Sequence, residues 1–355
     1  MPQEIQTTLV RIAQAFSCFP ETGGITALGQ GHINDTFLAK DGGRGEAIVL
    51  QRINHNVFLR PRAVVANQLL LYRHLKAQET GLLLPKPLPC GPGNYLMEDS
   101  QGQYWRATTY LADTFSMETV SVPETIHAVA KTYGNYVRAL SSLDAGQLQD
   151  TIPHFHHAVL RSRQLAFAAS HGLAERRKEA AFELQCLRQY QGIFIRITRL
   201  TLPVRAVHND AKMGNILFRC SDQKPCAVID WDTTMRGSIL SDFGDMVRTI
   251  AATCPEDDPR QGVATIDSLR FEALAAGWMD GVGAVLTPQE RENLLLGAHW
   301  LILEQAMRFL TDYLLGDKYY KINHPAHNLD RTRNQLDLYQ SLLEQESALL
   351  RFIKG

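Results

Sequence analysis

The sequence contains few cysteines, and none of them forms a recognisable pair. Among the 355 residues there are 6 cysteines, and no two are spaced as C-x-x-C. That spacing is typical of structural zinc sites and dithiol redox centres, while small disulfide-stabilised domains carry cysteine at a much higher density. The pattern therefore indicates neither a zinc site nor a disulfide framework, and it favours reduced thiols in the cytoplasm.

The chain also lacks an excess of one charge and a long hydrophobic run. Its 36 Lys and Arg residues nearly balance its 37 Asp and Glu residues, whereas a nucleic-acid-binding protein usually carries a basic excess. No apolar run approaches the roughly 20 residues that cross a bilayer. Polar residues interrupt the apolar stripe of residues 1–16, unlike the core of a signal peptide. We therefore expect a cytoplasmic protein with no nucleic-acid and no membrane partner, and its oligomeric state stays open.

Two short motifs in the second half of the chain carry the strongest chemical signal. The first, HNDAKMGNILF, places Asp210 five residues before Asn215. The second, VIDWD, delivers Asp230 at the end of an apolar run that predicts a buried strand. Phosphoryl transfer needs a base for the attacking hydroxyl and two oxygen ligands for magnesium. The spacing predicts Asp210 as the catalytic base and Asn215 and Asp230 as ligands of Mg²⁺, with ATP as phosphate donor. A surface turn, the alternative, does not require this spacing.

Residues around these motifs suggest supporting roles. Lys212 is expected to offset charge on the transferring phosphate, unless it is a solvated loop lysine. Asp242 and Asp245 are expected to brace the catalytic loop by accepting backbone hydrogen bonds, although Asp242 also suits a helix N-cap. The run HFHH at 154–157 has no nearby cysteine or carboxylate to complete a metal site, so we interpret it as a solvated helix start.

The order of predicted elements indicates an α+β protein with the two lobes of a protein kinase. Residues 1–111 are expected to form an N-lobe of short strands that covers the nucleotide, and residues 112–355 a mostly helical C-lobe that holds the catalytic loop, metal site and substrate pocket. Strands are predicted in a hairpin over 24–40 and at 47–53, 94–97 and 104–111. Helices are predicted at 61–77, 126–140, 175–190 and 287–315, followed by a last amphipathic helix that includes 336–353.

The N-lobe offers a glycine turn and a strand cation for the nucleotide. Gly29 and Gly31 could let backbone amides approach phosphate, although glycines also make ordinary hairpin turns. Arg52, on the 47–53 strand, is the candidate cation for the nucleotide phosphates. Its neighbour Gln51 points to the opposite face, so the reverse register would leave Arg52 on the surface.

The last N-lobe strand is expected to end at the hinge between the lobes. There Thr109 and Leu111 are the candidate nucleotide contacts. Protein kinases pair their strand lysine with a helix glutamate, but no acidic residue occurs between Arg60 and Gln78. Either Asn67 takes that place or the pair is absent.

These motifs resemble the aminoglycoside phosphotransferase and choline kinase superfamily, and within it most closely the N-acetylhexosamine 1-kinases. The resemblance rests on GHINDTF, LQRINHNVF, HNDAKMGNILF, VIDWDTTMRGSILSDFGDMVR and RFLTDYLLGDKYY. It implies transfer of the ATP γ-phosphate to the anomeric hydroxyl of GlcNAc or GalNAc, with His32, Asp35 and Arg308 holding the sugar. Two alternatives stay open: a kinase of an amino alcohol or aminoglycoside, and a nucleotide-binding protein without catalytic activity.

Overall fold

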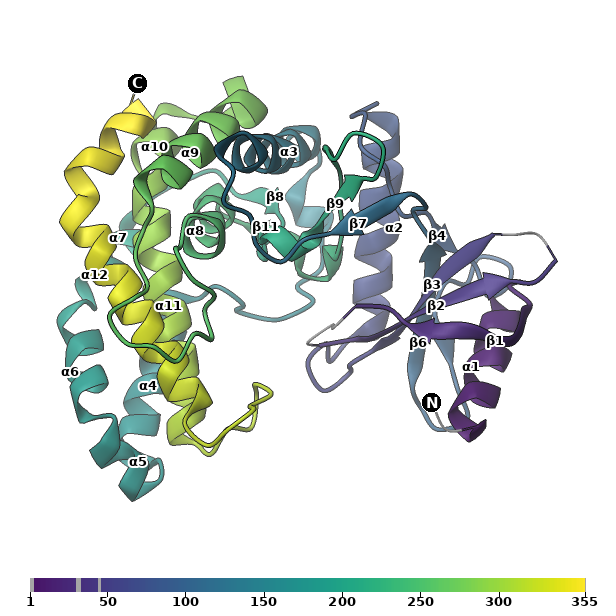
Figure 1. Cartoon of the computed structure of the whole chain (residues 1–355), viewed down its shortest axis with the longest axis horizontal. Helices are drawn as coiled ribbons and strands as arrows, with labels where there is room; N and C mark the ends of the chain where they lie inside the picture. Colours follow the sequence, from purple (N-terminus) through teal and green to yellow (C-terminus); the bar gives the residue numbers. More distant parts are fainter. Residues whose placement is uncertain (1–2, 30–32, 44–45, 355) are drawn as a thin grey trace.

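The structure is a computed structural model, and it describes residues 3–29, 33–43 and 46–354. Two lobes form the molecule, one built on a β-sheet and the other largely on helices (Figure 1). The sheet lobe contains α1 (Gln3–Ala15), β1 (Pro20–Ala27), β2 (Asp35–Asp41), β3 (Ala47–Ile53), α2 (Pro61–Ala77), β4 (Pro87–Leu88), β5 (Met97–Glu98) and β6 (Tyr104–Thr109). The predicted two-lobe, kinase-like α+β fold is confirmed, and α2 and β3 occupy the predicted residues.

The N-lobe sheet has two faces with different neighbours. Its strands run antiparallel in the order β1-β2-β3-β6-β4, and β5 also pairs with β6. Ile48 and Leu50 of β3 share a buried cluster with Leu9 and Ile12 of α1, so this face packs against the first helix. Because side chains alternate along a strand, Gln51 of β3 lies on the opposite face.

The C-lobe surrounds short strands with helices, and its elements follow the hinge in chain order. They are β7 (Thr114–Ser116), α3 (Pro123–Leu140), α4 (Ala158–His171), α5 (Ala174–Glu179), α6 (Ala181–Gln189), α7 (Gly192–Arg199), β8 (Arg205–Val207), β9 (Ile216–Arg219), β10 (Pro225–Val228), β11 (Met235–Gly237), α8 (Ile239–Ile250), α9 (Ser268–Val282), α10 (Pro288–Glu292), α11 (Leu294–Leu314) and α12 (His327–Lys354). The predicted division at residues 111 and 112 falls between β6 and β7, and β7 pairs with β9 of the C-lobe.

Four predicted elements differ from the structure in their extent. The strand predicted over 94–97 is displaced to Met97–Glu98. The strand predicted over 104–111 ends at Thr109. The helix predicted over 175–190 is divided at Ala180, and the helix predicted from Thr287 is interrupted at Asn293, where the backbone leaves helical geometry (φ −106°, ψ 7°). The capping box between Thr287 and Glu290 does form, so the predicted helix start is confirmed.

Two glycines let the helix behind the catalytic loop approach α11 closely. A Cβ atom on Gly244 of α8 would lie 2.3 Å from the carbonyl oxygen of Gly297 on α11. A Cβ on Gly297 would lie 2.3 Å from the carbonyl oxygen of Leu240. The absence of side chains at this crossing therefore brings α11 against the elements of the active site.

Within the described part of the chain, no helix has the length and apolar character needed to cross a membrane.

Candidate active site

The loop between β8 and β9 gathers three of the predicted site residues. The Nζ atom of Lys212 lies 3.0 Å from Oδ2 of Asp210. The side-chain amide of Asn215 donates hydrogen bonds to the same Oδ2 atom and to the backbone carbonyl of Asp210, both at 2.9 Å. The spacing of these residues in the sequence therefore corresponds to direct contact.

The charges of this loop keep its carboxylate ionised. Burial by itself raises the pKa of Asp210, but the positive charge of Lys212 and the hydrogen bond from Asn215 outweigh it and lower the pKa to about 2. Conversely, the negative charge of Asp210 raises the pKa of Lys212 above its usual value. At neutral pH the loop consequently presents a carboxylate and an ammonium group side by side.

The loop is held by contacts from behind. Asn209 adopts a left-handed conformation (φ 63°), which Asn tolerates better than most residues. Asp242 of α8 accepts hydrogen bonds from the backbone N–H groups of His208 (2.8 Å) and Asn209 (2.7 Å). Ser238, rather than Asp242, caps α8. The predicted bracing role of Asp242 is therefore confirmed, and its alternative as the N-cap is not.

Among the residues that the structure describes, no backbone N–H group of the loop donates to the side chain of Asp245. Its Oδ1 atom lies 2.8 Å from Nη2 of Arg248, and the same guanidinium group contacts Glu256. The prediction that Asp245 accepts backbone hydrogen bonds was wrong, because the arginine one turn along α8 pairs with the carboxylate.

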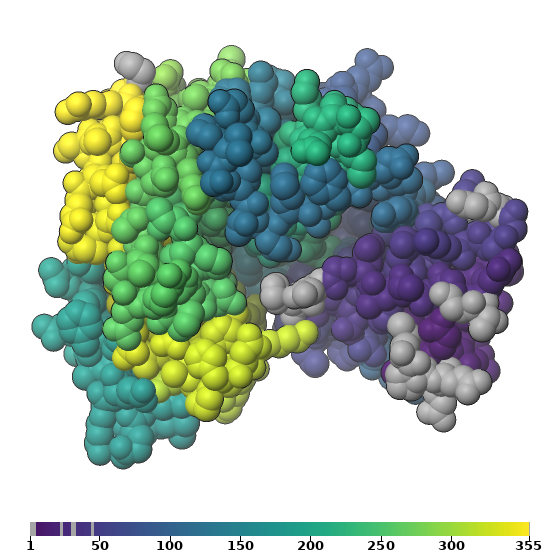
Figure 2. All heavy atoms as spheres, viewed as in Figure 1, coloured from purple at the N-terminus to yellow at the C-terminus, as the bar shows by residue number. Residues whose placement is uncertain are grey.

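Asp230 lies beyond β10 at the edge of the cleft between the lobes. His208 Nε2 lies 2.9 Å from the carbonyl oxygen of Ile229, which ties Asp230 to the catalytic loop. Asp230 itself has a left-handed backbone (φ 59°). The protein that surrounds it on the two sides of the cleft, and then the negative charges of Asp232 and Asp210, raise its pKa to about 6, although the residue is open to solvent. Figure 2 shows the molecule hollowed between the N-lobe, in purple, and the C-lobe, in green and yellow.

The cation on the C-lobe side of the N-lobe sheet is Arg106, not Arg52. Arg106 of β6 lies opposite Gln51 in the sheet and donates to its Oε1 atom at 3.0 Å. Its Nη1 atom forms a buried ion pair with Oδ1 of Asp232 at 2.6 Å, and Asn34 donates to Oδ2 of the same carboxylate at 2.8 Å. Asp232 thus joins the two lobes. Two features of the sequence could have indicated this contact. Asp232 is the second Asp of VIDWD, and Gln51 lies on the sheet face opposite to that of Arg52.

Arg52 occupies the other face of the sheet, so its assignment to the nucleotide phosphates is corrected. It pairs with Asp35, and 44% of its side chain is exposed. Its guanidinium carbon lies 6.0 Å from the ring centroid of Trp105, on the face that packs against α1. The acidic partner of Arg52 therefore comes from β2. Asn67 of α2 instead bonds to the backbone of Gln149 in the C-lobe.

The remaining N-lobe predictions concern the glycine turn and the hinge. Gly31 and His32 lie outside the described residues, and Gly29 adopts a left-handed backbone (φ 70°). At the hinge, Thr109 exchanges hydrogen bonds with the backbone of Lys86. The N–H group of Leu111 makes no hydrogen bond within the part of the chain that the structure describes.

On the C-lobe side, Arg308 of α11 lies among aromatic rings. Its guanidinium carbon is 5.1 Å from the ring centroid of Phe155, 5.7 Å from that of Tyr320 and 5.8 Å from that of Tyr319. Asp35 pairs with Arg52 in the N-lobe, and within the described residues no contact joins it to Arg308.

Asp312, one turn beyond Arg308 on α11, is fully engaged by the following loop. Its two oxygens accept hydrogen bonds from the backbone N–H groups of Lys318 (2.8 Å), Tyr319 (2.9 Å) and Tyr320 (3.0 Å). This carboxylate therefore shapes the loop that carries the two tyrosines.

The HFHH run was predicted to be a solvated helix start, but the side chain of His156 contacts residues of the C-lobe interior instead. His156 contacts Oε1 of Glu304 through Nδ1 (2.9 Å) and the carbonyl oxygen of Asn209 through Nε2 (3.1 Å). Trp300 donates to the other oxygen of Glu304 at 2.8 Å. Although burial opposes ionisation, His156 lowers the pKa of Glu304. No local spacing indicates these contacts, because Glu304 and Asn209 are distant in the sequence.

The fold and this site together define a two-lobe kinase. The chain matches the model of the phosphotransferase enzyme family (APH) over residues 24–278, and it belongs to that family. It is therefore a phosphotransferase that uses ATP and a hydroxyl acceptor.

Solved structures with the same fold share little sequence with this chain. An amicoumacin kinase, hAmiN, solved with AMP-PNP, Ca²⁺ and Ami, is 12% identical with a TM-score of 0.62, covering 95% of this chain and 96% of its own. A microcompartment-associated aminopropanol kinase is 16% identical with a TM-score of 0.62, covering 97% and 99%. A choline/ethanolamine kinase family protein from Mesorhizobium loti is 18% identical with a TM-score of 0.55, covering 94% of each chain.

Proposed function

We propose that the protein transfers the γ-phosphate of ATP to the anomeric hydroxyl of an N-acetylhexosamine, GlcNAc or GalNAc, in the presence of Mg²⁺. The observation that carries this choice of acceptor is the state of the carboxylates around Arg308. Asp312 is occupied by backbone N–H groups, and Glu304 is occupied by His156 and Trp300. A cationic amine needs an accessible carboxylate, whereas a neutral sugar is suited by a guanidinium group and aromatic rings.

In this proposal Asp210 orients the attacking hydroxyl and accepts its proton. The low pKa keeps Asp210 ionised, and the contacts of Asn209 with Asp242 hold the loop in place. Lys212, beside Asp210, offsets negative charge on the transferring phosphate. Because the family is one of enzymes, a nucleotide-binding protein without catalytic activity is the weaker alternative.

Asn215 and Asp230 are the proposed ligands of Mg²⁺. Asn215 donates its amide hydrogens to Asp210, which leaves its oxygen available. Within the described residues, the carboxylate of Asp230 accepts no hydrogen bond, and desolvation together with neighbouring negative charges raises its pKa. Such an electron-rich oxygen pair suits a hard divalent cation. When bound, Mg²⁺ would neutralise charge on the nucleotide phosphates.

We assign the nucleotide contacts of the N-lobe to Arg106 and to the hinge. The positive charge of Arg106 is close enough to oppose the rise in the pKa of Asp230, so Arg106 lies near the proposed phosphate site. The unpaired N–H group of Leu111 is available to a nucleotide base, and Thr109 flanks it. Gly29, with Gly31, is proposed to cover the phosphates, and His32 is proposed to help hold the sugar. Asp35 is not retained for this role, because it lies opposite Arg52 on the sheet face that packs against α1.

The decisive experiment is a set of acceptors tested with Mg-ATP by release of ADP. N-acetylhexosamines should be phosphorylated, while plain hexoses, choline and aminopropanol should react at least about tenfold less efficiently. A 1-deoxy N-acetylhexosamine should inhibit without accepting phosphate, and a 6-deoxy sugar should still react. Phosphate on the 1-deoxy sugar, or preferential use of an amine, would overturn the proposal.

The pocket assignment is tested separately with Arg308→Ala. This change should raise the KM for the sugar about tenfold or more and leave ATP binding similar, because Arg308 is proposed to contact only the acceptor. Lys318→Ala, on the adjoining loop, is the matched control, since the Lys318 side chain is exposed. Equal KM values in the two variants would place the sugar elsewhere.

A further inference from the structure

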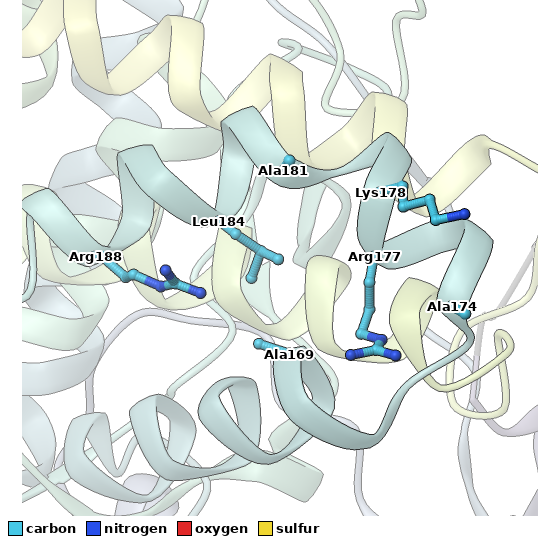
Figure 3. Close-up of a pocket in the computed structure, with 7 residues that line it drawn as sticks. All are labelled: Ala169, Ala174, Arg177, Lys178, Ala181, Leu184 and Arg188. Atoms are coloured by element: carbon cyan, nitrogen blue, oxygen red, sulfur yellow. The ribbon is translucent and has the colours of Figure 1, made fainter.

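A second hollow with a basic lining lies among α4, α5 and α6. Its volume is about 450 Å³, and its lining residues are Ala169, Ala174, Arg177, Lys178, Ala181, Leu184 and Arg188. Figure 3 shows the guanidinium groups of Arg177 and Arg188 on opposite sides of Leu184 and Ala169, and the ammonium group of Lys178 directed away from them. None of the proposed catalytic or metal-binding residues lines this hollow, so it is separate from the active site.

The three carboxylates of α5 and α6 each have a partner other than Arg177 and Arg188. Glu175 pairs with Lys178 at 3.1 Å. Glu179 accepts a hydrogen bond from the hydroxyl of Tyr313 at 2.6 Å. Glu183 accepts from Nε of Arg333 at 2.6 Å. Glu175 therefore balances Lys178 of the lining, and none of the three carboxylates pairs with Arg177 or Arg188.

The two arginines that face the hollow consequently have no acidic partner within the described residues. Arg177 donates one hydrogen bond, to the carbonyl oxygen of Ser170 at 3.2 Å, and its buried Nε atom has no partner among them. Arg188 is exposed to solvent, and it makes no hydrogen bond or ion pair within the same part of the chain. By contrast, Arg176, the neighbour of Arg177 on α5, pairs with Asp317. Two uncompensated guanidinium groups thus lie beside an apolar floor.

We infer that this hollow binds a phosphate monoester with a small apolar body. Guanidinium groups match the geometry of phosphate oxygens and bind them through charge-assisted hydrogen bonds. A phosphate monoester carries close to two negative charges at neutral pH, which balances both arginines, whereas a carboxylate balances one. Leu184 and the alanines offer contact to the apolar part, and the volume is in the range of small-molecule sites.

The hollow is connected to the loop that carries the aromatic residues near Arg308. Arg176, next to Arg177, donates to the carbonyl oxygen of Tyr313 at 2.6 Å and pairs with Asp317. Glu179 bonds to the hydroxyl of Tyr313. Binding that steadies α5 is therefore expected to steady the loop at residues 315–320.

The test uses isothermal titration calorimetry on the whole chain, with the active site filled by AMP-PNP and Mg²⁺. Phenyl phosphate should bind saturably, one molecule per chain, and more tightly than inorganic phosphate or benzoate. Arg177→Gln with Arg188→Gln should weaken it at least about tenfold, because charge-assisted hydrogen bonds are lost. Arg163→Gln, an exposed arginine on α4 outside the hollow, should leave affinity unchanged. Equal affinity in the double variant and the control, no saturable binding, or tighter binding of benzoate would overturn the inference.

Hydrogen exchange provides the second readout. Phenyl phosphate should slow amide exchange in the peptide over residues 313–322 in the wild type and in Arg163→Gln, but not in the double variant. Unchanged exchange in the wild type would overturn the connection to the loop. Neither measurement requires turnover, so the results of both are independent of whether the proposed sugar acceptor is correct.

Discussion

The catalytic loop and the N-lobe sheet each place a cation against a carboxylate, but over very different distances along the chain. In the loop, Lys212 contacts Asp210 two residues away. In the sheet, Arg106 contacts Asp232, which belongs to the other lobe. The first pairing follows from a turn of a few residues. The second exists only after β6 has taken its register and the lobes have met.

The same difference explains why the sequence pointed to Arg52 rather than to Arg106 as the cation facing the C-lobe. Arg52 and Gln51 are neighbours on β3, and a strand directs neighbouring side chains to opposite faces. The sequence shows that they point apart but does not show which face meets the C-lobe. The packing of Leu9 and Ile12 of α1 on the face with Leu50 decides it.

The largest effect is expected from a substitution in the catalytic loop, where the paired residues are close in the sequence. Asp210→Asn keeps the shape of the side chain and removes the proton acceptor, so turnover should fall by roughly 10²-fold or more with similar nucleotide affinity. Steady-state kinetics and nucleotide binding measure this. Asp222→Asn, on an exposed loop, is the control. A variant of Asp210 within threefold of the wild type would mean that another residue is the base.

Asp230→Asn tests the metal site. Loss of a charged oxygen ligand should raise the Mg²⁺ concentration needed for half-maximal activity by about tenfold or more, and it should weaken nucleotide binding when Mg²⁺ is present. A magnesium titration at saturating ATP measures the shift. An unchanged Mg²⁺ requirement would remove Asp230 from the ligand set.

The contact between the lobes, which joins residues far apart in the sequence, is tested by two arginine substitutions. Arg106→Gln should raise the KM for ATP by about tenfold and lower the free energy of unfolding by about 3 kcal/mol, because it leaves the buried Asp232 carboxylate unpaired. Arg52→Gln should change both quantities little, since surface ion pairs contribute weakly. The reverse order of effects would restore Arg52 as the phosphate cation.

His156 tests whether the loop depends on distant support. His156→Ala removes the contact with the carbonyl oxygen of Asn209, so kcat should fall by about fivefold to tenfold with little change in KM. His154→Asn is the matched change, because His154 is exposed and has a left-handed backbone that Asn tolerates. Equal kcat values for the two variants would show that the loop does not depend on His156 and that Asp242 holds it without this contact.

The smallest effect concerns acid stability. Because His156 lowers the pKa of the buried Glu304, the ionised carboxylate stabilises the folded state above its ordinary pKa of 4.5, and this stabilisation is lost as the pH falls below that value. Urea unfolding should therefore show that Glu304→Gln loses less stability than the wild type between about pH 5 and about pH 3. Glu175→Gln, at an exposed ion pair, should behave like the wild type. If the free energy of unfolding fell equally with pH in the wild type and in both variants, this explanation would be wrong.

The sequence by itself determined the elements and contacts that depend on a few neighbouring residues. The helix at 61–77, the strand at 47–53, the capping box at Thr287 and the cluster of Asp210, Lys212 and Asn215 all follow from local spacing, because each is set within one turn, strand or loop. The family resemblance likewise rests on short blocks, and the family match agrees with it.

Tertiary structure alone decided which face of the sheet meets the C-lobe and which distant groups support the catalytic loop. Asp232 joins the lobes through Arg106, and Glu304 supports Asn209 through His156. Asp312 is engaged by the loop that follows it rather than left for a ligand. The physical reason is common to these contacts: a buried charge takes the partner that packing brings within hydrogen-bonding distance, and residue spacing says nothing about that partner.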